Sequence, residues 1–317
     1  MQEFSAVPQA EVEDTLAELR GKFAVALDLG GTKLAAALID VNGRILHKRK
    51  QPTERKDAGR SIRQLAAAAR QVVDEAGCPW EAIAAAGLDV PGIYFAETGE
   101  VWAPNLPGWD RIPLRDMLRG ELPVPVVIDS DRAAYVLGEQ WLGAARGLSD
   151  VVFLAVGTGI GAGILSGGRL IRGTGDIAGS VGWFALDPEW KDIYGRKGCM
   201  ESEAAGPALA RRLGAPSAEK VVLAARKGDK AAAEAVSATA SFLAMGIANI
   251  ISILNPQMIV LGGGLMRAGD LFLEQIRHEA LKWAQPISAG QVRIELTELG
   301  EDAGLLGAAR LALFGAP

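Results

Sequence analysis

The sequence predicts an α/β protein made of two similar domains around a cleft. Glycine clusters follow apolar strands at three places, one layout of strands and turns occurs twice, and amphipathic helices lie between the strands. With 317 residues, the chain also exceeds the usual size of a single hydrophobic core. Its 49% hydrophobic and 22% charged residues are ordinary for a globular protein.

The first ribbon begins with an apolar strand, FAVALDL, which carries Asp28 near its end. The stretch Gly30-Gly31-Thr32-Lys33 follows, and glycines there let backbone N–H groups approach an anion closely. A Rossmann or P-loop site would pass from its glycines into a helix, but here a second apolar strand and then Asn42-Gly43 follow. Asn-Gly favours a hairpin, because both positions tolerate positive φ. The glycine loop is therefore predicted to be a bend between antiparallel strands.

A helix and a further strand come next. Residues 58–77 have apolar residues at helical spacing and end on Gly77, and residues 83–92 read as a strand with Pro91-Gly92 at its tip. Ahead of the ribbon, residues 1–21 are a polar extension, in which one short helix is expected outside the core.

The same layout returns at residues 151–173. An apolar strand leads into Gly157-Thr158-Gly159, and a second strand, a Gly-Gly turn and a third strand follow. A third cluster, Gly262-Gly263-Gly264, ends the strand QMIVL. Any one of these loops alone is explained more simply as a tight turn, but three at strand ends favour a polyphosphate held from two sides.

Asp131 has two interpretations. A strand is expected to end at Ile128, and Asp129, Ser130 and Asp131 precede a helical run. Asp131 is then either an N-cap or first-turn acid, or a general base at the cleft end of a strand. Later helices are expected at 203–214, 229–254 and 303–315, and the last is long enough to pack on the first domain.

These elements define the expected domains. We predict an N-terminal extension at 1–21, an N-terminal α/β domain at 22–128 completed by the helix at about 303–317, and a C-terminal α/β domain at 129–302.

Composition argues against several classes of partner. The formal net charge of −5 disfavours nucleic acid, which needs a concentrated basic surface. Cys78 and Cys199 lie far apart and predict a reducing compartment without a disulfide framework. No stretch reads as a membrane span and the first residues lack the apolar core of a signal peptide, so a cytoplasmic protein without a membrane partner is expected.

Together these features resemble the ROK family of repressors, uncharacterised reading frames and sugar kinases, within the actin-like ATPase (ribonuclease H-like) fold. The resemblance covers about residues 23–315. Its matching stretches, in chain order, are ALDLGGTKLAAALID, VPGIYFAETGEVWAPNLPGW, DSDRAAYVLGEQWLGAA, GTGIGAGILSGGRLIRG, GCME, ILNPQMIVLGGG and EDAGLLGAA. It implies glucokinase-like phosphorylation of a sugar hydroxyl by ATP, and a homodimer.

The resemblance also implies how ATP and Mg²⁺ would bind. Asp28 would hold Mg²⁺ directly or through water, so that the cation turns repulsion between this carboxylate and the phosphates into attraction. The residues that would border the phosphates and the adenosine are Gly30, Gly31, Thr32, Lys33, Gly157, Thr158, Gly159, Gly262, Gly263 and Gly264.

For the sugar, the resemblance implies an Asn-Asp pair whose Asp takes the proton of the attacking hydroxyl. Ser130-Asp131 occupies those positions, so the base is present and the Asn has become Ser. Asn105 and the Pro91-Gly92 turn match other sugar-site positions, and Glu201 matches a carboxylate that binds sugar hydroxyls.

The chain departs from the family at two further sugar positions and at its zinc motif. Ser180 and Trp183 stand where many members carry a Glu and a zinc-binding His. Of the cysteine cluster only Cys199 is present, with Asp192 and Tyr194 at the other positions, so a structural zinc is not expected. Trp183 would stack on a sugar face, accept a bulkier substituent, or simply pack in the core.

Three functions stay open at this point. An ATP-dependent sugar kinase leads. A non-catalytic sugar-binding regulator is the alternative, although about 22 residues ahead of the first strand are too few for a helix-turn-helix domain. The third is a kinase-like protein that binds nucleotide but has lost sugar binding.

Overall fold

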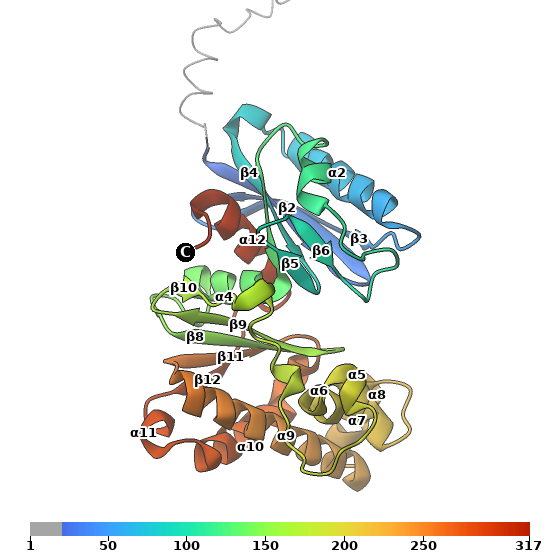
Figure 1. Cartoon of the computed structure of the whole chain (residues 1–317), viewed down its shortest axis with the longest axis vertical. Helices are drawn as coiled ribbons and strands as arrows, with labels where there is room; N and C mark the ends of the chain where they lie inside the picture. Colours follow the sequence, from blue (N-terminus) through green and yellow to red (C-terminus); the bar gives the residue numbers. More distant parts are fainter. Residues whose placement is uncertain (1–20) are drawn as a thin grey trace, which may run out of the picture. The chain divides into compact units, whose positions relative to one another are not determined.

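The computed structural model describes residues 21–317, which form two compact units (Figure 1). Unit 1 contains the described residues up to Gly138 together with Gly304–Ala316, and unit 2 contains Glu139–Ala303. The boundary between the units lies inside helix α4 (Asp131–Leu142), after Gly138. The sequence placed this boundary between residues 128 and 129, but the first turns of α4 pack within unit 1. The short helix expected in the N-terminal extension lies outside the described residues.

The sheet of unit 1 has the strand order β3-β2-β1-β4-β7. Strands β1 and β2 are antiparallel and so are β2 and β3, while β1, β4 and β7 run parallel to one another. Between β4 and β7 in the sequence, β5 and β6 form a separate two-stranded antiparallel sheet. The bounds are β1 Phe23–Leu29, β2 Lys33–Asp40, β3 Ile45–Pro52, β4 Ile83–Val90, β5 Ile93–Phe95, β6 Glu100–Trp102 and β7 Val126–Ser130.

Successive side chains of these strands point to opposite faces of the sheet, and each face packs against different helices. Val25, Leu27 and Leu29 of β1 belong to the buried cluster that contains the apolar residues of α2 (Ala58–Glu75) and α3 (Leu114–Arg119). The opposite face carries small residues, and α12 (Ala303–Phe314) packs there: a Cβ on Gly87 would lie 1.9 Å from the carbonyl oxygen of Ala308. Asp28, two residues after Ala26, therefore faces the side of α12.

The sheet of unit 2 has the strand order β10-β9-β8-β11-β12, which repeats the pattern of unit 1. Its first three strands are antiparallel, and β8, β11 and β12 are parallel. The bounds are β8 Val151–Val156, β9 Ile160–Ser166, β10 Arg169–Leu170, β11 Met258–Gly262 and β12 Arg293–Leu296. The internal duplication predicted from the sequence is thus present in the topology.

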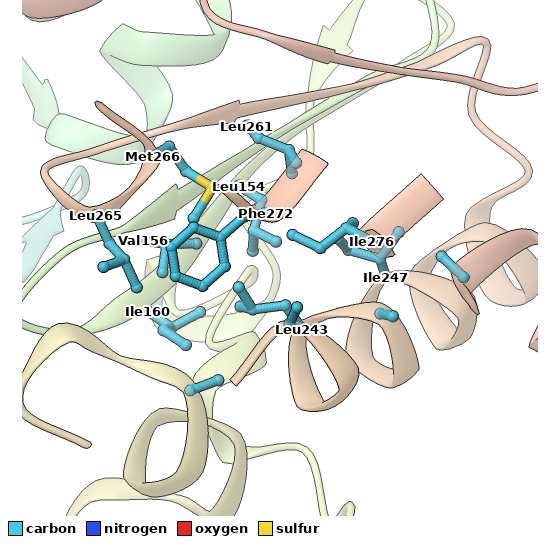
Figure 2. Close-up of a cluster of buried hydrophobic side chains, with 14 of the residues drawn as sticks. Leu154, Val156, Ile160, Leu243, Ile247, Leu261, Leu265, Met266, Phe272 and Ile276 are labelled. Atoms are coloured by element: carbon cyan, nitrogen blue, oxygen red, sulfur yellow. The ribbon is translucent and has the colours of Figure 1, made fainter. Parts of the chain in front are cut away.

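The helices of unit 2 build one buried core, in which Phe272 and Ile276 of α10 (Gly269–Trp283) meet Leu243 and Ile247 of α9 (Lys230–Leu254), as Figure 2 shows. The remaining helices are α5 Tyr194–Lys197, α6 Cys199–Ala204, α7 Gly206–Arg212, α8 Ala218–Arg226 and α11 Pro286–Ala289. With 25 residues, α9 has the length and apolar composition of a membrane span, so the expectation that no stretch qualifies was wrong. Its burial in this core identifies α9 as a core helix of unit 2.

The predicted hairpin at Asn42-Gly43 is confirmed, but not its turn geometry. Gly43 has φ 81°, and Asn42 is not among the described residues with positive φ. Instead the Asp40 carboxylate accepts the N–H groups of Asn42 and Arg44, both at 2.9 Å. Gly167-Gly168 in the second ribbon has positive φ at both positions, as a two-residue hairpin turn requires.

Candidate functional site

The first glycine loop closes β1 onto β2. The Gly30 N–H donates to the Lys33 carbonyl at 2.8 Å, and a Cβ on Gly30 would lie only 2.9 Å from that oxygen. Thr53 fixes the loop from β3's end, since its N–H donates to Thr32 and its hydroxyl donates to the Gly30 carbonyl at 2.8 Å. Thr32 and Lys33 are exposed, and nothing stands within 4 Å of a Cβ on Gly31. The loop therefore presents open backbone, as a phosphate-binding turn needs.

Three aspartates form a row across the parallel strands of unit 1. Asp28 of β1 is in register with Asp89 of β4, and Asp89 is in register with Asp129 of β7. Asp28 is half-buried, whereas Asp89 is 0% and Asp129 3% exposed. Burial, followed by the charge of Asp28, raises the pKa of the Asp89 carboxyl well above its usual range. Sequence reasoning missed Asp89, because it reads as one polar residue at the end of an apolar strand.

Asp131 is the first residue of α4, and Ser130 caps the helix. The Ser130 Oγ accepts the N–H of Ala133 at 3.3 Å, which is the N-cap interaction. Asp131 is a half-buried first-turn acid whose Oδ1 accepts the Arg132 N–H at 2.7 Å. Burial raises the pKa of the Asp131 carboxyl to about 6, against the opposing effects of the Arg132 charge and that N–H.

Arg132 connects the start of α4 with the Pro91-Gly92 turn. Its guanidinium donates to the Gly92 carbonyl at 3.3 Å. Gly92 has φ 88°, and a Cβ there would stand 2.2 Å from the Trp102 carbonyl oxygen, so only glycine fits this turn. Asn105 is exposed, and its carbonyl accepts a bond from the Arg55 guanidinium at 3.3 Å. Contacts within unit 1 therefore link Gly92 directly to the residue after Asp131.

In unit 2, Glu201 lies against the second glycine loop. Its Oε2 accepts the Ile160 N–H at 2.9 Å, and a Cβ on Gly159 would stand 2.8 Å from the same oxygen. Burial raises the pKa of this half-buried carboxyl. The Gly157 N–H donates to the Gly159 carbonyl at 2.9 Å, and the Gly157 carbonyl accepts the N–H of Gly206 at 2.8 Å. The predicted phosphate loop and the predicted sugar-binding carboxylate thus share one local structure.

A cavity of about 870 Å³ opens beside this loop, and we call it the unit 2 cavity. Gly157 and Thr158 line it together with Gly264, apolar residues of α7 and α8, and charged groups such as Arg211 and Glu219. This mixture and size suit a nucleotide-sized ligand. Gly262 and Gly263 do not line the cavity. A Cβ on Gly262 would meet the Phe153 ring at 2.2 Å, and one on Gly263 would meet the Val156 carbonyl oxygen at 2.6 Å.

Ser180 and Trp183 flank a short turn of unit 2. The Ser180 hydroxyl donates to the Ile177 carbonyl at 2.8 Å, and the Trp183 side chain is 57% exposed. The interpretation that Trp183 packs in the core is therefore wrong. The adjacent Gly182 contacts the predicted sugar carboxylate, because a Cβ there would stand 3.2 Å from the Glu201 Cβ.

A polar cluster occupies the stretch that corresponds to the family's zinc motif, where no zinc is expected in this chain. The Tyr194 hydroxyl lies 2.6 Å from Glu203 and 3.1 Å from Asp187, while Lys191 reaches both carboxylates at 3.0 Å. Cys199 is 5% exposed, and its sulfur accepts the Leu186 N–H at 3.4 Å. Cys199 is therefore a buried small residue of this segment.

The residues around Asp28 fit a divalent cation. Carboxylate oxygens are the ligands that Mg²⁺ prefers, and in kinase sites one or two carboxylates suffice because phosphates and water complete the shell. Gly304, at the start of α12, borders Asp28 closely, since a Cβ there would stand 3.1 Å from Oδ2. Among residues 21–317, no group of three or more His, Cys, Asp or Glu side chains gathers as a metal site.

Comparison with known proteins identifies the chain's relatives. The family model described as "ROK family" matches residues 24–314. A glucokinase of Thermotoga maritima is 32% identical over 90% of this chain and 96% of its own length. An N-acetylmannosamine kinase of Salmonella typhi is 34% identical over 91% and 97%.

Solved structures agree with this assignment. A ROK glucokinase of Streptomyces griseus, in complex with glucose and AMPPNP, matches with a TM-score of 0.77 and 29% identity, over 91% of this chain and 98% of that one. The fold is the actin-like ATPase fold, as the sequence predicted. The chain therefore belongs to the ROK family.

Proposed function

We propose that this protein is an ATP-dependent sugar kinase that transfers the γ-phosphoryl group of ATP to a hydroxyl of a hexose or hexose derivative. The observation that carries the proposal is Asp131: a half-buried carboxyl at the start of α4, with a pKa of about 6, in the unit that also holds Asp28. A general base works best when its pKa lies near the working pH, and this carboxyl meets that condition.

In unit 1, we assign proton transfer to Asp131. Its carboxylate takes the proton of the attacking sugar hydroxyl, and Arg132 keeps a positive charge beside it that favours the ionised form. Asn105, Ser130 and the Pro91-Gly92 turn orient the sugar. Asp28 holds Mg²⁺, which when bound neutralises charge on the phosphates. Gly30, Gly31, Thr32 and Lys33 border the phosphates.

In unit 2, we assign nucleotide binding to the cavity and its glycine loop. Adenosine occupies the unit 2 cavity, Gly157, Thr158 and Gly159 border phosphate, and Gly264 borders the adenosine. Gly262 and Gly263 act indirectly, by letting the Phe153 ring and Val156 pack closely behind Gly264. Glu201, whose Oε2 accepts the Ile160 N–H, accepts sugar hydroxyls through its Oε1.

The sugar itself is a narrower proposal. Glucose and N-acetylmannosamine are candidates because relatives of similar identity carry those names. The changes at Ser180 and Trp183 remove two polar contacts implied by the family resemblance and add an exposed aromatic ring, which suits stacking on a sugar face. We also propose that the protein is cytoplasmic and forms a homodimer.

A screen for sugar-dependent ADP formation tests this function. Purified full-length protein with Mg-ATP is assayed against hexoses, N-acetylhexosamines and small oligosaccharides. We expect at least one sugar to raise ADP release well above the rate with ATP alone. If sugars bind, by calorimetry, without raising ADP release, the regulator hypothesis replaces the kinase. If only nucleotide binds, sugar binding has been lost.

A further inference from the structure

Asp89 is a buried carboxyl for which the proposed mechanism has no role. It lies at the carboxyl end of β4 and is 0% exposed. Within the described chain, neither of its carboxylate oxygens has a hydrogen-bond partner. Asp129, the next carboxylate along the row, accepts the Ser130 N–H at 2.8 Å. Burial and the neighbouring acids favour the protonated form of Asp89, and a positively charged ligand is the alternative that would keep this buried, unpartnered group ionised.

The side chain of Asp89 is directed toward Asp28. The two residues are in register on parallel strands, so their side chains leave the same face of the sheet about 4.8 Å apart. Both Oδ2 atoms approach one point, the position of a Cβ on Gly304, at 2.9 Å for Asp89 and 3.1 Å for Asp28. Glycine at the first turn of α12 therefore leaves these two oxygens room to converge.

Two facing carboxylates repel each other unless something positive lies between them. The first turn of α12, which borders both carboxyl groups at Gly304, supplies part of the compensation through the positive end of the helix dipole. A divalent cation supplies the rest, because it neutralises both charges and gives the Asp89 oxygens a ligand. Mg²⁺ sites with two carboxylates and several waters are common in phosphoryl-transfer enzymes.

We infer that Asp89 is the second protein ligand of the divalent cation, so that Asp28 and Asp89 hold one Mg²⁺ before nucleotide arrives. This inference rests on the proposed role of Asp28. It assigns Asp89 to metal binding rather than to proton transfer, which stays with Asp131. The consequence is a site with measurable metal affinity in the protein without ATP.

Titration of nucleotide-free protein with Mn²⁺, followed by electron paramagnetic resonance, tests this. We expect the parent to bind one Mn²⁺ per chain, and Asp89→Asn and Asp28→Asn to weaken that binding by about tenfold or more. Asp129→Asn is the matched control: it removes the adjacent buried carboxylate and should leave the affinity within about threefold, the usual context scatter of such changes. Thermal melts serve as a second readout, since Mn²⁺ should raise the Tm of the parent but not that of Asp89→Asn.

The inference is overturned if Asp89→Asn binds Mn²⁺ as tightly as the parent, or if the parent binds none without nucleotide. In the second case Asp28 and Asp89 share a proton instead of a cation. The sugar-dependent ADP assay on the parent separates this failure from failure of the proposed function. Active parent with unchanged Mn²⁺ binding in Asp89→Asn rejects only the Asp89 ligand, whereas Mn²⁺ binding through Asp89 without any ADP formation rejects only the kinase.

Discussion

At the scale of single residues, Asp131 is expected to set the acid limb of the pH–rate profile. Its pKa of about 6 is raised mainly by burial. Below that pH the carboxyl carries a proton and cannot accept another, so kcat/KM should fall about tenfold per pH unit. Above it, the rate should reach a plateau. Steady-state rates from about pH 5 to 8 with the best sugar measure this, and a profile that is flat across that range would remove Asp131 as the base.

Glu201 is predicted to act on the sugar and not on ATP. A carboxylate accepting two sugar hydroxyls makes charge-assisted bonds, which an amide makes only weakly and in one orientation. Glu201→Gln should therefore raise the KM for the best sugar by about tenfold or more and leave the KM for ATP nearly unchanged. Glu189→Gln, an exposed carboxyl on the preceding segment, is the control. A sugar KM within about a factor of two of the parent's would make Glu201 structural.

At the scale of elements, side-chain contacts hold the segment from Trp183 to Cys199. Tyr194, Lys191 and Glu203 form a hydrogen-bonded cluster, and the Cys199 sulfur accepts a backbone N–H. A closed zinc site needs four ligands of the Cys, His or carboxylate type. We predict that elemental analysis of purified protein finds no stoichiometric zinc. About one zinc per chain would contradict this account of the segment.

The elements that follow from local patterns could be predicted from the sequence. The helix 58–77 ends where Gly77 takes positive φ, and both ribbons turn at their glycines. The predictions that failed or stayed open concern details that change when an element or a turn shifts by one residue. The sequence left Asp131 open between N-cap and first-turn acid, and the start of α4 makes Ser130 the cap. Asn42 was expected to have positive φ, but the Asp40 carboxylate stabilises a different turn.

The parts of the candidate site that could not be predicted depend on pairing between distant segments. Asp89 stands far from Asp28 in the sequence, and only the parallel register of β1 and β4 brings them together. Gly262 looked like a ligand-binding glycine, but the ring of Phe153 on the neighbouring strand explains it. Trp183 was open between packing and stacking, and its exposure follows from the turn that carries it. Sequence patterns report residue type and spacing, whereas these contacts are set by tertiary structure.

At the scale of the whole molecule, one supersecondary pattern serves two chemical purposes. In unit 1, three parallel strands end in the aspartates of the row and lead to Asp131. In unit 2, the same strand order ends at glycines beside the unit 2 cavity. Ligand sites of parallel sheets lie at the carboxyl ends of the strands, and the sites proposed in both units follow this rule. In the proposed mechanism, the duplicated fold supplies acid–base and metal groups from one copy, and a nucleotide-sized cavity from the other.

The most direct test of the central claim is sugar-dependent ADP formation by Asp131→Asn beside the parent, with Asp74→Asn, an exposed acid on α2, as the control. The amide keeps the shape of Asp131 but cannot take the hydroxyl proton, and Ser130 still caps α4. Turnover should fall by roughly 10²–10⁴, while the melting curve and ATP-analogue binding stay like the parent's. A variant that folds, binds nucleotide and forms ADP at a rate close to the parent's would contradict the assignment of Asp131 as the catalytic base.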